Sequence, residues 1–73
     1  PFSGMVRINS SETVNGVAQV SVYNILGIQV YTESIRCIET TEFVIDGSAL
    51  NSGIYFYNIA TKNGNMQGKI VKE

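Results

Sequence analysis

The sequence predicts an all-β fold, a small antiparallel β-sandwich of six to seven short strands, in a single domain over residues 1–73. Hydrophobic residues make up 44% of the 73, and most of them are Val, Ile, Tyr and Phe, which favour a pleated, half-buried surface. Apolar and polar residues alternate in short runs, and no window is better described by helical spacing. Turn signals separate these runs at intervals of roughly 8–12 residues, a spacing typical of small sandwiches.

The first strands are expected on either side of an early turn. Residues 5–9 alternate, with Val6 and Ile8 facing inward. Asn15-Gly16 predicts a hairpin turn, because both residues tolerate positive φ. The run that follows is the clearest half-buried strand, in which Ala18, Val20 and Val22 face inward and Gln19, Ser21 and Tyr23 face outward.

The middle of the chain is expected to hold two further strands. Gly27 breaks the alternation and is expected to take a backbone conformation that other residues resist. Residues 28–33 then resume as a strand antiparallel to the previous one. Residues 34–40 are ambiguous: Ile35 and Ile38 are candidates for burial, but the polar content favours an excursion from the sheet. Residues 41–46 form the next strand, with Phe43 and Ile45 inward.

The stretch from Leu50 to Ala60 is the one around which the chain is organised. Leu50, Gly53 and Tyr55 have the spacing of a tyrosine corner, in which a Tyr hydroxyl bonds back to nearby backbone in a two-sheet sandwich. We interpret Leu50 as the apolar residue that packs beneath this corner and Tyr55 as the residue whose hydroxyl fixes it. Gly53 allows the chain to turn there. In the strand that follows, Tyr55, Tyr57 and Ile59 share the inward face.

The last two strands are expected to form a hairpin. Asn63-Gly64 between two strand-like runs is a strong short-range hairpin signal. Residues 66–72 are the closing strand, with Ile70 buried. Gly68 inside this strand indicates a bulge or a close approach of another group.

The composition removes the usual means of catalysis. The chain has no His, so it lacks the commonest general base and metal ligand, and Ser-His and Cys-His pairs are impossible within it. Asp46 is the only Asp, and we interpret it as a solvated turn residue before Gly47. Cys37 is the only Cys, so no internal disulfide forms, and we expect it to be inert. We therefore predict no enzyme activity, no metal and no cofactor.

The charge and hydropathy also restrict the partners. A formal net charge of −1 is too small to indicate nucleic acid. No apolar run approaches the ~20 residues that a membrane helix needs, so we expect no direct membrane insertion.

Four stretches resemble one known family. Residues 20–31 resemble the strand–turn–strand of the C-terminal sorting domains of the type IX secretion system. Residues 50–56 resemble the family's block of leucine, two residues, glycine, a hydrophobic residue and tyrosine, and residues 69–72 resemble its basic, branched end. Pro1-Phe2 resembles the second half of a Tyr-Pro-Asn-Pro-Phe opening. The order is preserved along nearly the whole chain, but residues 34–40, which include Cys37, match nothing in the family pattern.

This resemblance implies a role in export. Members are immunoglobulin-like β-sandwiches at the end of secreted cargo proteins of Bacteroidetes. The cargo passes through the periplasm, is directed through the outer-membrane translocon and reaches the cell surface or the extracellular space. A surface sortase commonly removes the domain. The domain is then a non-catalytic signal.

We hypothesise that the translocon reads the last two strands. In this hypothesis Gly53 and Tyr55 set the geometry of the strands, while Lys69 and Lys72 present positive charge. The motive is the basic bias of this end of the chain and its match to the family's terminal block. Leu50 and Gly27 have structural roles in the same scheme.

Two other functions stay open. One is a carbohydrate-binding or adhesive module, for which Tyr23, Tyr31 and Phe56 are the exposed aromatic candidates. The other is a structural, fibronectin-like spacer of a surface protein. In either case a small sandwich has unpaired edges, so we expect a monomer or a weak, edge-strand dimer.

Overall fold

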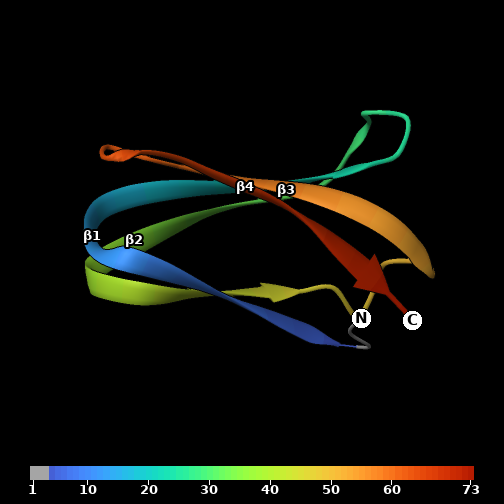
Figure 1. Cartoon of the computed structure of the whole chain (residues 1–73), viewed down its shortest axis with the longest axis horizontal. Helices are drawn as coiled ribbons and strands as arrows, with labels where there is room; N and C mark the ends of the chain where they lie inside the picture. The colour runs from blue at the N-terminus through green and yellow to red at the C-terminus, as the bar shows by residue number, and fades with distance from the viewer. Residues whose placement is uncertain (1–3) are drawn as a thin grey trace.

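The computed structural model describes residues 4–73, which form four β-strands and no helix (Figure 1). The strands are β1 (Met5–Asn24), β2 (Gln29–Asp46), β3 (Gly53–Thr61) and β4 (Gly64–Lys72). All are paired antiparallel in one sheet of order β2-β1-β3-β4. The all-β prediction is confirmed, whereas Pro1-Phe2 and Ser3 of the expected opening loop lie outside the described residues.

The prediction of six to seven strands is wrong, because the first two strands bend where breaks were expected. β1 has 20 residues and β2 has 18. Asn15-Gly16 lies inside β1 rather than in a hairpin turn, and the register with β2 shifts between Asn9 and Val14 and again between Val14 and Gly16. The excursion expected at residues 34–40 is also absent, since these residues continue β2.

The bend has a local cause in both strands. Gly16 has φ 93° and Glu39, opposite this region, has φ 46°. The Glu39 amide donates a hydrogen bond to Oδ1 of Asn15 over 2.8 Å, so a side chain replaces part of the interrupted ladder. Bulges of this kind kink a strand and increase its twist. Gly16 therefore has the positive φ that the sequence predicted, but it bends β1 instead of ending the strand in a turn.

The bend folds the sheet over, so that Figure 1 shows two levels. In the lower level, residues 5–9 of β1 pair with residues 42–46 of β2. In the upper level, the second half of β1 lies between β2 and β3, and β4 forms the edge. A single continuous sheet supplies both levels, and the structure does not confirm an immunoglobulin-like sandwich of two separate sheets.

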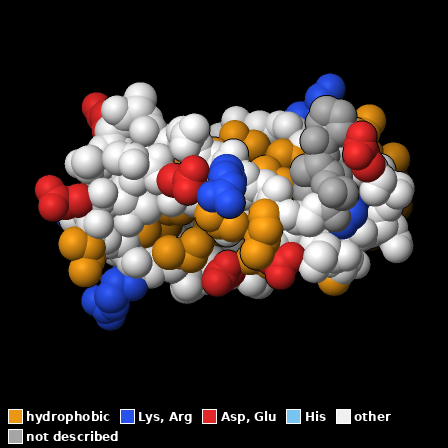
Figure 2. All heavy atoms as spheres, turned by 90° about the horizontal axis from the view of Figure 1, so that it is seen from below, with side chains coloured by type: hydrophobic (Ala, Val, Ile, Leu, Met, Phe, Trp, Pro, Cys, Tyr) orange, Lys and Arg blue, Asp and Glu red, His pale blue; other side chains and the backbone are white. Residues whose placement is uncertain are grey.

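One hydrophobic core lies between the two levels. The inward positions given by alternation are confirmed in both: Ala18, Val20, Val22, Phe43, Ile45 and Ile59 are each at most 1% exposed. Val6 and Ile8 pack against this core from the lower level, and Cys37 is buried in it. Seen from below, the lower level carries scattered charges of both signs among its exposed hydrophobic groups (Figure 2).

Two tight turns connect the remaining strands. Asn24 organises the β1–β2 turn, since its Oδ1 accepts from the amides of Leu26 and Ile28 over 2.9 and 3.0 Å, and Gly27 has φ 82°. The predicted β3–β4 hairpin is confirmed. Its two turn residues, 62 and 63, are followed by Gly64 with φ 125° as the first residue of β4.

Gly68 marks a close approach, one of the two alternatives that its place in a strand predicted. It lies opposite Tyr57 on β3, and the ring of Tyr57 covers it. A Cβ atom at position 68 would lie 2.5 Å from Cε2 and 2.6 Å from Oη of that ring. Only glycine therefore allows Tyr57 to lie flat across β4.

We predict that Gly68→Ala destabilises the fold by about 1–3 kcal/mol, the usual cost of forcing an extra group into packed surroundings. Urea unfolding followed by circular dichroism measures the change. Gly4→Ala is the matched control, because a Cβ atom at position 4 meets nothing within 4 Å. The cost should shrink in a Tyr57→Ala background, and an equal cost in both backgrounds would contradict the steric explanation.

Candidate recognition surface

The four residues of the recognition hypothesis divide into two groups in the structure. In the pairing of β3 with β4, Gly53 lies opposite Lys72 and Tyr55 lies opposite Ile70. These residues gather at the end of the hairpin beside the loop of residues 47–52. Lys69 lies opposite Phe56 instead, and both side chains are on the outer face of the sheet.

The tyrosine corner is present with the predicted contacts. The hydroxyl of Tyr55 donates to the carbonyl oxygen of Asn51 over 2.7 Å. Leu50 packs against the core, and its amide donates to the carbonyl of Gly47 over 3.0 Å. Gly53 has φ 151°, a value that other residues rarely adopt. The corner therefore fixes the start of β3 against the loop that leads into it.

Lys72 does not extend from the surface as the hypothesis expected. Its side chain is only 8% exposed, and Nζ donates a hydrogen bond over 2.8 Å to the carbonyl oxygen of the buried Gly47. The sequence contains a signal for this placement: Lys72 has the same parity in β4 as the buried Ile70. Lys72 thus ties the end of β4 to the loop before β3.

Asp46 lies next to this contact. Hydrogen bonds from Ser48 hold the pKa of the Asp46 carboxyl below its usual value, and the charge of Lys72 acts in the same direction. The Ser48 amide donates to Oδ1 of Asp46 over 3.1 Å. The interpretation of Asp46 as a turn residue before Gly47 agrees with this geometry.

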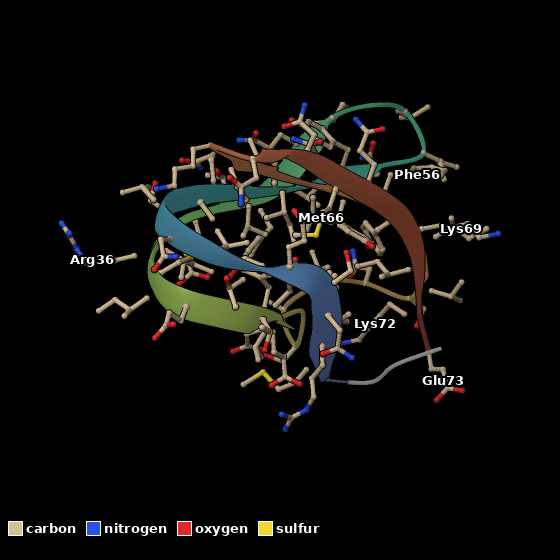
Figure 3. All side chains as sticks on the ribbon, turned by 60° about the vertical axis from the view of Figure 1, so that its left-hand side comes forward. Arg36, Phe56, Met66, Lys69, Lys72 and Glu73 are labelled. Atoms are coloured by element: carbon tan, nitrogen blue, oxygen red, sulfur yellow. The ribbon has the colours of Figure 1, made fainter. Side chains whose placement is uncertain are left out.

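Lys69 is aligned with two aromatic residues across the outer face of the sheet. Tyr23 of β1 lies opposite Phe56 of β3, which lies opposite Lys69 of β4. In the next row, Nε2 of Gln67 donates to Oδ1 of Asn58 over 3.2 Å. These side chains line an open groove of about 530 Å³. Figure 3 shows Phe56 and Lys69 on the same side of the hairpin, with Lys69 pointing away from the molecule.

Alternation had placed Tyr23 and Phe56 outside, but only the strand register brings them together. Tyr31, the third aromatic candidate, does not join them. It lies opposite the buried Val22, so its side chain is on the inner face, where it packs against the core. Its hydroxyl donates to Oε1 of Glu33, which raises the pKa of Tyr31 to about 12.

The outer face near the groove is also apolar. Ile54, Phe56 and Val71 are 44%, 45% and 36% exposed, although all three lie within strands of the sheet. Their parity is opposite to that of the buried Tyr55, Ile59 and Ile70, and the register of β3 with β4 makes Ile54 and Val71 direct neighbours.

The described residues hold no arrangement for metal chemistry or for crossing a membrane. Within residues 4–73, no three His, Cys, Asp or Glu side chains are grouped so that they could hold a metal ion. The same residues contain no helix with the length and apolar character needed to span a bilayer.

The geometry defines a small β domain with an exposed aromatic groove on its outer face. Comparison with protein families places it further. The family of secretion system C-terminal sorting domains matches residues 1–73. The chain belongs to this family and is a type IX secretion sorting signal. No curated protein and no solved structure matches the chain.

We predict that Tyr55→Phe lowers the free energy of unfolding by about 0.5–1.5 kcal/mol, the usual net contribution of one hydrogen bond. The reason is loss of the bond to the Asn51 carbonyl. Thermal unfolding followed by circular dichroism provides the measurement. Tyr23→Phe, on the outer face, is the control and should leave the unfolding temperature nearly unchanged. Equal effects of the two substitutions would contradict the role of the corner.

We predict that Lys72→Met destabilises the domain by about 1.5–3 kcal/mol, because it removes a charged donor from the Gly47 carbonyl while it retains most of the apolar side chain. Lys69→Met is the matched control on the same strand and should change stability by less than about 0.5 kcal/mol. Urea unfolding of the two variants distinguishes them. Equal, small effects would show that the buried contact does not stabilise the fold.

Proposed function

We propose that this chain is the non-catalytic signal module that directs a cargo protein from the periplasm through the outer-membrane translocon of the type IX system, and that a surface sortase then removes it. The observation that carries the proposal is the family match over residues 1–73. Membership implies export toward the cell surface or the extracellular space. Passage through the outer-membrane translocon of a Bacteroidetes cell and removal by a sortase are inferred from this membership.

The physical character of the domain supports a signal role. A signal needs a folded surface that a receptor can bind, and it needs no acid, base or metal. The outer face offers such a surface in the groove around Phe56 and Lys69. Small domains also bury only roughly 60% of their unfolded surface, so their stability is low. Low stability suits a segment that is removed after use.

The positions of the four residues in the recognition hypothesis support a direct role for one of them and indirect roles for the other three. Lys69 presents charge, because its side chain is exposed on the outer face. Lys72, Tyr55 and Gly53 act indirectly, by fixing the end of the β3–β4 hairpin on which Lys69 is displayed. Leu50 and Gly27 support the corner and the β1–β2 turn.

The proposal predicts that a secreted reporter fused to this chain is exported by a host with a working type IX system. Lys69→Glu should lower the exported fraction about tenfold, the effect of losing about 1.4 kcal/mol of binding. Arg36→Glu is the matched control, since it makes the same charge change at the opposite end of the molecule (Figure 3). Reporter activity in cells and culture medium gives the exported fraction.

Several outcomes would contradict the proposal. Retention of the parent fusion inside the cell would overturn the signal role altogether. Equal export of the Lys69→Glu and Arg36→Glu fusions would remove Lys69 from the recognition surface. A glycan array with strong binding, together with retention of the fusion, would favour the carbohydrate-binding alternative, and export that persists without the domain would favour a spacer.

A further inference from the structure

The edge of the sheet at β4 is unusually regular. β4 has β3 as its neighbour on one side and no strand of residues 4–73 on the other. Its register with β3 runs without a shift from Gly53 opposite Lys72 to Thr61 opposite Gly64. Along an edge strand, every second residue directs its N–H and C=O groups away from the sheet. β4 thus presents an uninterrupted row of main-chain donors and acceptors along its free edge.

Natural proteins usually block such edges with proline, bulges, short strands or charges. β4 contains no proline and no acidic residue. It has no bulge, and its length is 9 residues. Of its two charged side chains, Lys72 is turned inward toward Gly47, so Lys69 is the only charge that extends from the strand.

The other edges of the sheet differ from the β4 edge. The opposite edge of the upper level, formed by the start of β2, is interrupted by a register shift between Val22 and Tyr23 of its neighbour β1. The bend has further shifts between Asn9 and Val14 and between Val14 and Gly16, and the lower level has charges of both signs on its surface (Figure 2). Among the edges of the described sheet, β4 therefore has the longest register without a shift.

The outer face beside the C-terminal half of this edge is apolar apart from Lys69, and the polar pair of Gln67 and Asn58 follows it. Val71 and Gln67 project from β4 on either side of Lys69, and Ile54 and Phe56 lie behind them on β3. A strand added beside β4 would place alternate side chains next to this row, because residues of one parity share a face. Main-chain pairing and side-chain contacts would then be made together.

We propose that β4 binds an extended segment of the export machinery by β-strand addition. This proposal rests on the proposed function, since it states how the machinery reads the signal. The added strand would continue the sheet as a fifth strand, with its main chain bonded to the free edge of β4. Such binding takes affinity from main-chain hydrogen bonds and specificity from alternate side chains.

The outer face also defines the chemistry of the segment. The side chain that lies beside Lys69 is acidic, because opposite charges on directly paired positions attract. The side chain beside Val71 is apolar. A second copy of β4 is a poor fit, since it has no acidic residue to place beside Lys69 and would bring two lysines onto one face. The segment is therefore from a different protein.

A proline scan of β4 in the reporter fusion tests this proposal. Proline removes one N–H, and edge strands tolerate it where that N–H faces solvent. Asn65, Gln67 and Lys69 form one set of positions, and Met66 and Ile70 form the other; Gly68 is left out, because any Cβ atom there meets the ring of Tyr57. One set breaks pairing with β3 and unfolds the domain; the other leaves it folded, as resistance of the fused domain to protease will show. Only the folded set is compared for export.

Two matched controls isolate the main chain. Alanine at the same position removes the side chain but keeps the N–H. Proline at Thr32 or Glu33, whichever stays folded, makes the same change at the β2 edge. We expect each folded β4 proline variant to be exported about tenfold less than its alanine counterpart, as for loss of one well-made hydrogen bond. The β2 variant should be exported like the parent.

The possible outcomes distinguish failure of strand addition from failure of the signal role. Equal export of folded proline and alanine variants would overturn strand addition and leave the signal role intact, whereas failure of the parent fusion would overturn the signal role. A tight dimer in light scattering that the folded proline variants abolish would assign the edge to a second copy and so overturn the proposal.

A second variant decides the matter if no proline variant folds. It adds a short Asn-Gly turn and an alternating Thr-Val strand after Glu73, so that the chain covers its own β4 edge. Its control carries a tail of equal length interrupted by prolines. We expect the covered form to lose export and the control to retain it. Equal export of the two forms would overturn strand addition.

Discussion

The bend in the β1–β2 hairpin is the constraint on which the rest of the structure depends. Phe43 and Ile45 reach the core because β2 turns under the upper level after Glu39. Without this turn, the upper sheet would expose Val20, Val22 and Ile59 on one face. The Asn15 side chain supports the bend by accepting from the Glu39 amide. A chain of 73 residues thus builds two layers from a single sheet, which needs fewer connections than two separate sheets would.

The way the sheet closes also determines where recognition can occur. Folding uses the inner face for the core, so the outer face of β1, β3 and β4 stays exposed with Tyr23, Phe56 and Lys69 in one row. The end of β4 is fixed by the bond from Lys72 to Gly47 and by the tyrosine corner on β3. The hairpin is therefore held firmly at its end while its edge remains open. This combination suits a surface that a receptor binds by pairing.

Local patterns predicted much of this arrangement. Period-two alternation found most buried positions of both levels, although it missed Val14 and Cys37, and the Leu50, Gly53 and Tyr55 spacing predicted a hydrogen bond that the structure contains. The prediction failed where one local feature has two possible uses. Asn15-Gly16 fits a hairpin turn and a bulge equally well, since both need positive φ. The choice between them depends on pairing with Glu39 of β2, which lies 24 residues beyond Asn15.

The sequence by itself determined the fold class, the inward and outward face of each strand, the corner and the absence of His. It also carried the family pattern across the whole chain. The tertiary structure decided how many strands there are, that Lys72 is buried, that Tyr23 and Phe56 adjoin, and which strand forms the open edge. The physical reason is that alternation reports only which face a residue occupies. Register, bending and strand order depend on pairing between distant segments, and short patterns do not specify that pairing.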